Sequence, residues 1–242
     1  MAVDQASWDA SVRHLYRDAT VYIATGPRRH EDWVLDVLAV TARVPDPRGW
    51  AVVDDTARHP DREGFPTYPF AVHPPEYVAR RLQEIDRDSA EDLLLALTET
   101  GCTLDNLRYF DETPDELRAM ARTVLARYGD EATFHTNVSK QGSAPGNLDF
   151  TREGLGYKPL GIFMEDCGLV VVTDTEVGLF WSFADQWSIR WPPPTAPPGT
   201  PPSNGSSTRC TPSRGSGPGG TTTGPWTSWP SWSGPSPTPG AG

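Results

Sequence analysis

Three cysteines and five histidines are the side chains of this sequence best suited to nucleophilic, acid–base or metal chemistry. Cys102, Cys167 and Cys210 share no CxxC spacing, and the dispersed histidines form no HxxxH or HExxH pair that a helix would bring to one face. Cys167 follows Glu165 and Asp166, and neighbouring carboxylates oppose the thiolate form that a nucleophile needs. We therefore expect no catalytic residue, no metal site and no cofactor, and we interpret Cys167 as a small buried thiol.

Glycine-rich segments are the next candidates, because backbone N–H groups in such loops can bind phosphate. The turn at 26–29 lacks the GxGxxG and GxxxxGK[ST] patterns, and Pro27 removes an N–H that an anion cradle would need. The segments 142–146 and 154–156 indicate a surface loop. This loop, 136–157, is the longest candidate for a functional segment. It is where we place the alternative function, a small hydrolase or transferase with a scattered active site.

Adjacent acidic residues recur along the chain. With 32 Asp and Glu residues, most such pairs are expected from a solvated surface and from helix capping. Four of these residues, Asp54, Asp55, Glu165 and Asp166, are our candidates for binding a partner.

The charge of the chain is uneven, and it argues against nucleic-acid binding. The formal net charge is −11, but residues 191–242 hold no acid and two arginines, so residues 1–190 combine 19 cations with 32 acids for a net of −13. Such a surface repels phosphate backbones and steers a basic partner toward it. We therefore expect a basic protein partner and no nucleic acid.

Sequence features also bear on the compartment. No apolar run approaches the 18 or so residues of a membrane span, and the N-terminus lacks the basic and apolar regions of a signal peptide. We expect a cytoplasmic protein without membrane contact. Arginine outnumbers lysine by 19 to 2, which indicates a GC-rich bacterial gene.

Hydrophobic periodicity and turn residues predict both helices and strands. The best-specified helix spans 114–128, with Thr113 as N-cap, Pro114 in the first turn, Glu116 completing a capping box and Gly129 at the C-terminus. Further helices are predicted at 7–18, 75–86 and 93–98, the last with a capping box at Ser89–Asp92. Strands are predicted at 20–25, 50–53, 169–172 and 177–183, and also near 68–72 and 132–138. The segment 33–44 fits a helix or a buried strand, and acidic residues at its start favour the helix.

These elements indicate an α+β protein. We expect a single domain whose mixed or mainly antiparallel sheet ends in a C-terminal β-hairpin and is packed by three to five helices. The strands 169–172 and 177–183 are apolar on both faces, which predicts a sheet covered on both sides or a central position of these strands within it.

The composition divides the chain into an acidic α+β domain at 1–190 and a tail at 191–242 that is rich in Pro, Gly, Ser and Thr. Three interpretations of the tail stay open. The first is a disordered segment, since the tail lacks the apolar side chains that a core needs. The second is a recognition tail that carries Trp226, Trp229 and Trp232. The third is an out-of-frame translation of a GC-rich gene.

Acidity and the absence of a catalytic constellation together favour a non-enzymatic interaction protein. An immunity or antitoxin-like role, in which the domain neutralises a cationic partner, belongs to this class.

Overall fold

A computed structural model of the chain describes residues 4–99, 101–151, 156–163 and 165–183. These residues belong to one compact unit, Met1–Trp191. The predicted domain boundary at residue 190 and the predicted tail at 191–242 lie outside the described residues.

Helices and strands are interspersed up to α5, and the elements described after it are all strands. The α-helices are α1 (Gln5–Leu15), α2 (Trp33–Thr41), α3 (Pro75–Arg81), α4 (Arg87–Ala96) and α5 (Pro114–Ala126), and two short 3₁₀ helices are η1 (Pro60–Glu63) and η2 (Leu104–Tyr109). The strands are β1 (Val21–Pro27), β2 (Ala51–Asp54), β3 (Gln83–Ile85), β4 (Thr133–Thr136), β5 (Val138–Ser139), β6 (Gly156–Tyr157), β7 (Asp166–Val172) and β8 (Glu176–Phe183).

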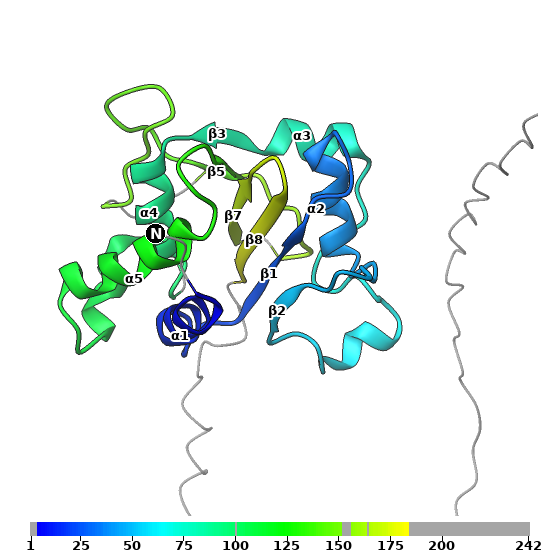
Figure 1. Cartoon of the computed structure of the whole chain (residues 1–242), viewed down its shortest axis with the longest axis horizontal. Helices are drawn as coiled ribbons and strands as arrows, with labels where there is room; N and C mark the ends of the chain where they lie inside the picture. Colours follow the sequence, from blue (N-terminus) through cyan, green and yellow to red (C-terminus); the bar gives the residue numbers. More distant parts are fainter. Residues whose placement is uncertain (1–3, 100, 152–155, 164, 184–242) are drawn as a thin grey trace, which may run out of the picture. The chain divides into compact units, whose positions relative to one another are not determined.

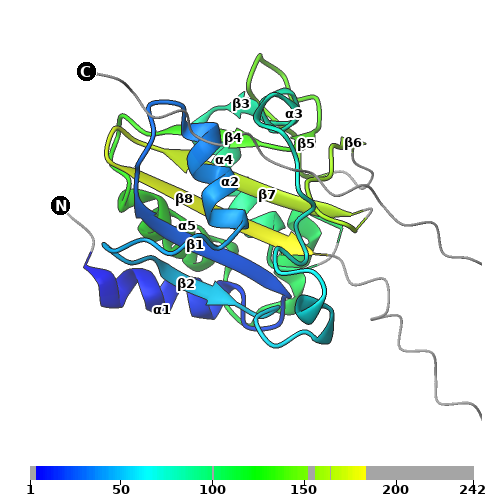
Figure 2. The ribbon, with the colours of Figure 1, turned by 90° about the vertical axis from the view of Figure 1, so that its right-hand side faces the viewer.

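Six strands form one antiparallel sheet in the order β2-β1-β8-β7-β4-β3, and β5 pairs with β6 in a separate ribbon (Figures 1 and 2). The fold is therefore mixed helix and antiparallel sheet, as predicted. β7 and β8 are joined by a short turn and pair from Asp166 with Phe183 to Val172 with Val177. Whether a hairpin ends the sheet depends on the chain after residue 183, which lies outside the described residues.

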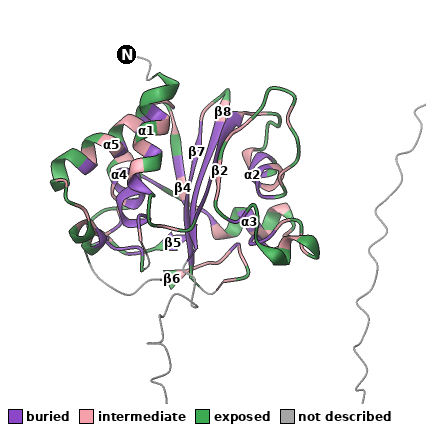
Figure 3. Ribbon diagram, turned by 90° about the horizontal axis from the view of Figure 1, so that it is seen from below, coloured by how far each residue is buried: buried purple, intermediate pink, exposed green. Residues whose placement is uncertain are grey.

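Helices cover both faces of this sheet (Figure 3). On one face α1, α4 and α5 pack against side chains such as Leu169 and Phe180, and on the other α2 and α3 pack against Val170 and Trp181. Successive residues of a strand point to opposite faces, so a central strand between two helical layers must be apolar throughout. The predicted double coverage is confirmed.

The helix predicted at 114–128 is observed as α5, with the predicted cap. The Thr113 hydroxyl accepts from the Glu116 N–H, and the Glu116 carboxylate accepts from the Thr113 N–H at 2.8 Å. Gly129 follows at a positive φ of 74°, a conformation that favours glycine.

The prediction for residues 75–98 is wrong in its boundaries. The helix predicted at 75–86 ends at Arg81, and the chain then forms the edge strand β3, where pairing with β4 buries Ile85. α4 consequently begins earlier than predicted, and its N-cap is Asp86, whose carboxylate accepts from the Ser89 N–H at 2.7 Å. Tertiary strand pairing has here overridden a local helical pattern.

Smaller differences occur elsewhere. α1 begins at Gln5 and not at residue 7 as predicted, because Asp4 caps it. The strand predicted near 68–72 is reduced to a single bridge between Phe70 and Gly161. The strand predicted near 132–138 divides into β4 and β5, while the ambiguous segment 33–44 forms the helix α2.

Across the described ranges, none of the helices combines the length and apolar character that crossing a membrane requires.

Candidate functional site

The four predicted partner-binding acids lie at the same end of the large sheet. The pairing can be followed across the sheet. Asp55, after β2, bonds to Val21 of β1, and Val21 pairs with Ser182 of β8. Ser182 in turn pairs with Cys167 of β7, the residue after Asp166. Three strand spacings therefore separate the two acidic pairs, a distance of about 14 Å. Their environments differ, so they do not form one surface.

Asp54 is neutralised within the protein. Its carboxylate lies 2.9 Å from Nε of Arg43 and 3.4 Å from Nη1 of Arg62, and it also accepts from the Thr56 hydroxyl at 2.7 Å. The side chain is only 11% exposed. A carboxylate with these partners fixes the turn after β2. Its oxygens are already occupied by hydrogen bonds and ion pairs within the chain, so they are poorly placed to bind a partner protein.

Asp55 and Glu165 are the two exposed members of the set. Asp55 accepts from the Val21 N–H at 3.0 Å, which extends the pairing of β1 with the chain after β2. Both carboxylates remain candidates for contact with a basic partner.

Asp166, the fourth predicted partner-binding acid, is fully buried, so its carboxylate is not presented at the surface of the described fold. Its carboxylate accepts from the backbone N–H groups of Leu160 and Gly161 and from the Asn137 side-chain amide. Burial raises the pKa of Asp166 from 3.8 to about 6, while the hydrogen bonds from Gly161 and Leu160 act in the opposite direction. The residue is a structural anchor.

The raised pKa of Asp166 predicts a pH-dependent stability. The folded state binds the Asp166 proton more tightly than the unfolded chain, so this contribution is fully present below pH 3.8 and is lost as the pH rises through about 6. The shift corresponds to about 3 kcal/mol in the free energy of unfolding. We expect the stability of the wild type, relative to Asp166→Asn, to fall by about that amount between pH 3 and pH 7 in urea unfolding. A difference that is constant across this range would contradict the assignment.

Asp166 and Asn137 together hold the base of the 136–157 loop. The Asn137 amide donates to the Asp166 carbonyl at 2.7 Å, its side-chain oxygen accepts from the Gly168 N–H at 2.9 Å, and its carbonyl accepts from the Lys158 N–H. These bonds tie the point where the chain leaves β4 to the start of β7. They therefore position the loop that the sequence marked as the longest functional candidate.

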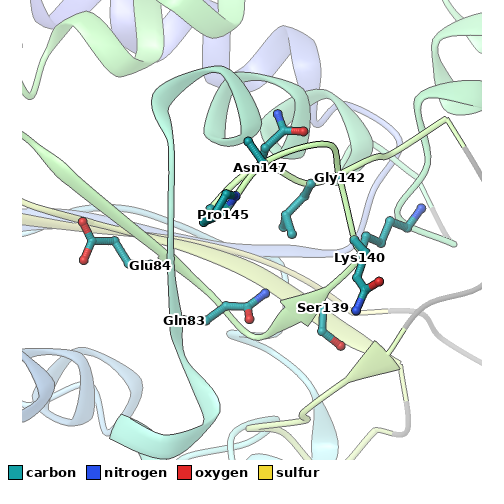
Figure 4. Close-up of a pocket in the computed structure, with 11 residues that line it drawn as sticks. Gln83, Glu84, Ser139, Lys140, Gly142, Pro145 and Asn147 are labelled. Atoms are coloured by element: carbon teal, nitrogen blue, oxygen red, sulfur yellow. The ribbon is translucent and has the colours of Figure 1, made fainter.

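This loop encloses a cavity of about 440 Å³ against β3 (Figure 4). Such a volume lies within the range of sites that bind small ligands. Gln83 and Glu84 of β3 form one wall, and the segment 139–148 forms the other. A Gln83 side-chain bond to the Val138 carbonyl at 2.6 Å joins the two walls.

The cavity is polar, but its side chains do not form an acid–base pair. Glu84 and Lys140 are the titratable residues of its lining, and they point away from each other (Figure 4). The Lys140 ammonium lies 5.4 Å from the centroid of the Phe150 ring, and burial lowers its pKa. The arrangement can bind a polar group more readily than it can transfer a proton.

Cys102 and Cys167 are brought together, a pairing that their separation in sequence did not reveal. Both thiols are buried beside Tyr157. Burial, reinforced by contact with Cys102, raises the pKa of Cys167 well above its ordinary value. This environment disfavours the nucleophilic thiolate, in agreement with the interpretation of Cys167 as a small buried thiol.

A second cavity, of about 210 Å³, lies beside β2 and was not anticipated. Tyr22, Val40, Trp50 and Val52 give it a largely apolar lining. Gly26 permits this packing, because an added Cβ there would overlap the Trp50 ring. The one sequence feature connected with this second cavity is Gly26 itself, which lies in the turn predicted at 26–29.

Among the residues that the structure places, no cluster of three or more His, Cys, Asp or Glu side chains is arranged to hold a metal ion.

No protein-family model, curated protein sequence or solved structure matches the chain.

Proposed function

We propose that this chain is a non-enzymatic, cytoplasmic interaction domain that binds a basic protein, as an immunity or antitoxin-like protein does. The supporting observation is the charge of its surface. Among the described residues, nineteen exposed Asp and Glu residues face eight exposed Arg residues, and both described Lys residues are at least partly buried. A surface with this imbalance accelerates association with a cationic partner and disfavours acidic ones.

The imbalance persists after the internal ion pairs are counted. Asp54 is held by two arginines, and Glu91 is 3.0 Å from Nη2 of Arg122, yet neither acid belongs to the exposed set. Asp18 is exposed and pairs with Arg17, but most of the exposed carboxylates keep their charge for solvent and partners. Asp55 and Glu165 stay within this set as proposed partner contacts.

Affinity capture followed by reconstitution tests the proposal. The full chain is immobilised, exposed to proteins of the source organism, and each retained protein is purified and remixed with the chain. We expect a stoichiometric complex in analytical ultracentrifugation with a partner of net positive charge. Retention of neutral or acidic proteins alone, or of none that re-forms a complex when pure, would contradict the proposal.

The alternative function, a small hydrolase or transferase, is favoured by one observation, the cavity of about 440 Å³ at the 136–157 loop. Lys140 would be its one cationic group for an anionic substrate. The alternative predicts turnover of phosphoester, ester or glycoside substrates that is lost in Lys140→Gln. The absence of turnover across such a panel would reject it.

A further inference from the structure

We infer that an extended segment of the basic partner adds a strand to the outer edge of β3, within the cavity under the 139–148 loop. This inference rests on the proposed function and gives the interface a location. Strand addition to an exposed edge derives its affinity from main-chain hydrogen bonds and its specificity from the side chains around the slot.

The outer edge of β3 faces this cavity. β3 is an end strand of the sheet, paired through Gln83, Glu84 and Ile85 to β4. The Asp86 N–H donates away from β4, to the Gly146 carbonyl in the loop, at 3.0 Å. Backbone groups alternate in direction along a strand, so the N–H and carbonyl of Glu84 also point outward.

The opposite wall is braced and leaves the slot open. The Gly142 N–H donates to the Asn147 carbonyl at 3.0 Å, and the Asn147 N–H donates to the Ala144 carbonyl at 3.1 Å. The Asn147 side chain also accepts from the Ser143 N–H. In Figure 4 the Glu84 carboxylate points away from the loop, so it leaves the backbone accessible and lies at the rim.

The charge at this edge selects a basic segment. Glu84, Asp86 and Asp88 are all exposed at the junction of β3 with α4. Arg87, which lies between two of them, directs its guanidinium over the Phe134 ring, 5.0 Å from the centroid, and bonds to the Gly129 carbonyl. Lys140 in the opposite wall is buried and lies over the Phe150 ring, so the exposed charges at this rim are acidic.

The other edge of the sheet lacks this selectivity. In β2 the Asp55 N–H bonds to the Val21 carbonyl, so by the same alternation Val52 presents its backbone groups outward. The adjoining cavity is apolar, and its acid, Asp54, is paired with Arg43. Val52 thus provides a matched control, an outward-facing edge residue beside a cavity whose one lining acid is paired.

Proline substitution at the two edges tests the inference. Proline removes an N–H and is tolerated at outward-facing positions of edge strands. Binding of Glu84→Pro, Glu84→Gln and Val52→Pro is measured against the reconstituted basic partner and against basic twelve-residue peptides selected from a random phage library on the wild type. We expect affinity to fall about tenfold or more in Glu84→Pro and about twofold to threefold in Glu84→Gln, and to stay unchanged in Val52→Pro.

A second variant guards against local unfolding of β3. Ala144→Trp fills the slot from the exposed loop without altering the β3 backbone, and it should block binding as Glu84→Pro does. If the partner binds all β3 and loop variants with wild-type affinity, the β3 edge is not the interface, although the proposed function stands. If no basic protein binds the wild type, the proposed function itself fails.

Discussion

Replacing Asp166 by alanine is expected to lower the free energy of unfolding by about 3 kcal/mol at pH 7. The substitution removes the acceptor for the backbone N–H groups of Leu160 and Gly161 and for the amide of Asn137. Buried donors that lose their acceptor cost their full desolvation free energy. This cost outweighs the free energy gained because the carboxylate charge of Asp166 is no longer buried. Urea unfolding followed by circular dichroism measures the change.

Glu165→Ala is the matched control for this substitution. Glu165 precedes Asp166 but is exposed, so its removal should change stability by no more than about 0.5 kcal/mol. Equal losses in the two variants would show that Asp166 is not the anchor of the loop base. Because Asn137 links Asp166 to the 136–157 loop, we also expect faster amide exchange in that loop in Asp166→Ala alone.

Gly168→Ala is the second substitution with a large expected effect, a loss of about 3 kcal/mol in the free energy of unfolding. Gly168 pairs with Trp181 in the neighbouring strand, and an added Cβ would overlap the indole ring. The ring is 1% exposed and packs against Phe70 at 5.9 Å between centroids, so it cannot move without disturbing the core of that face.

Gly64→Ala controls for the general effect of removing a glycine. Gly64 has a φ of −94° and no atom within 4 Å of an added Cβ, so alanine should leave stability unchanged or raise it slightly. Thermal unfolding of both variants makes the comparison. A Gly168→Ala midpoint equal to that of the wild type would mean that the Trp181 ring does not cover Gly168 as described.

Hydrophobic patterns and capping residues predicted correctly those helices and strands whose packing in the fold agrees with the local pattern. α5 combined an apolar stripe with a complete capping box, and β7 and β8 were apolar on both faces because helices cover both. β3 illustrates the opposite case. Its residues continued a helical pattern, and only the partner strand β4, about 50 residues further along the chain, gives Ile85 its burial as part of a strand.

The candidate site could be predicted only in part, because burial is not visible in a list of charged residues. Asp54 and Asp166 looked like Asp55 and Glu165 in sequence, but arginines neutralise Asp54 and the core encloses Asp166. The 136–157 loop, which its length and composition mark as a candidate, lines a cavity against β3. Its pairing with the β3 edge depended on a strand that the sequence did not indicate.

The dissociation constant of the purified chain and its reconstituted basic partner, measured by isothermal titration calorimetry at 50 and 300 mM NaCl, tests the central claim most directly. If the exposed carboxylates drive binding, the constant should rise about tenfold or more at the higher salt concentration, because salt screens the attraction between the two surfaces. It should also rise at low salt in the Asp55→Asn, Glu165→Gln double variant. A dissociation constant that is the same at both salt concentrations would contradict the proposal that this acidic surface recognises a basic protein.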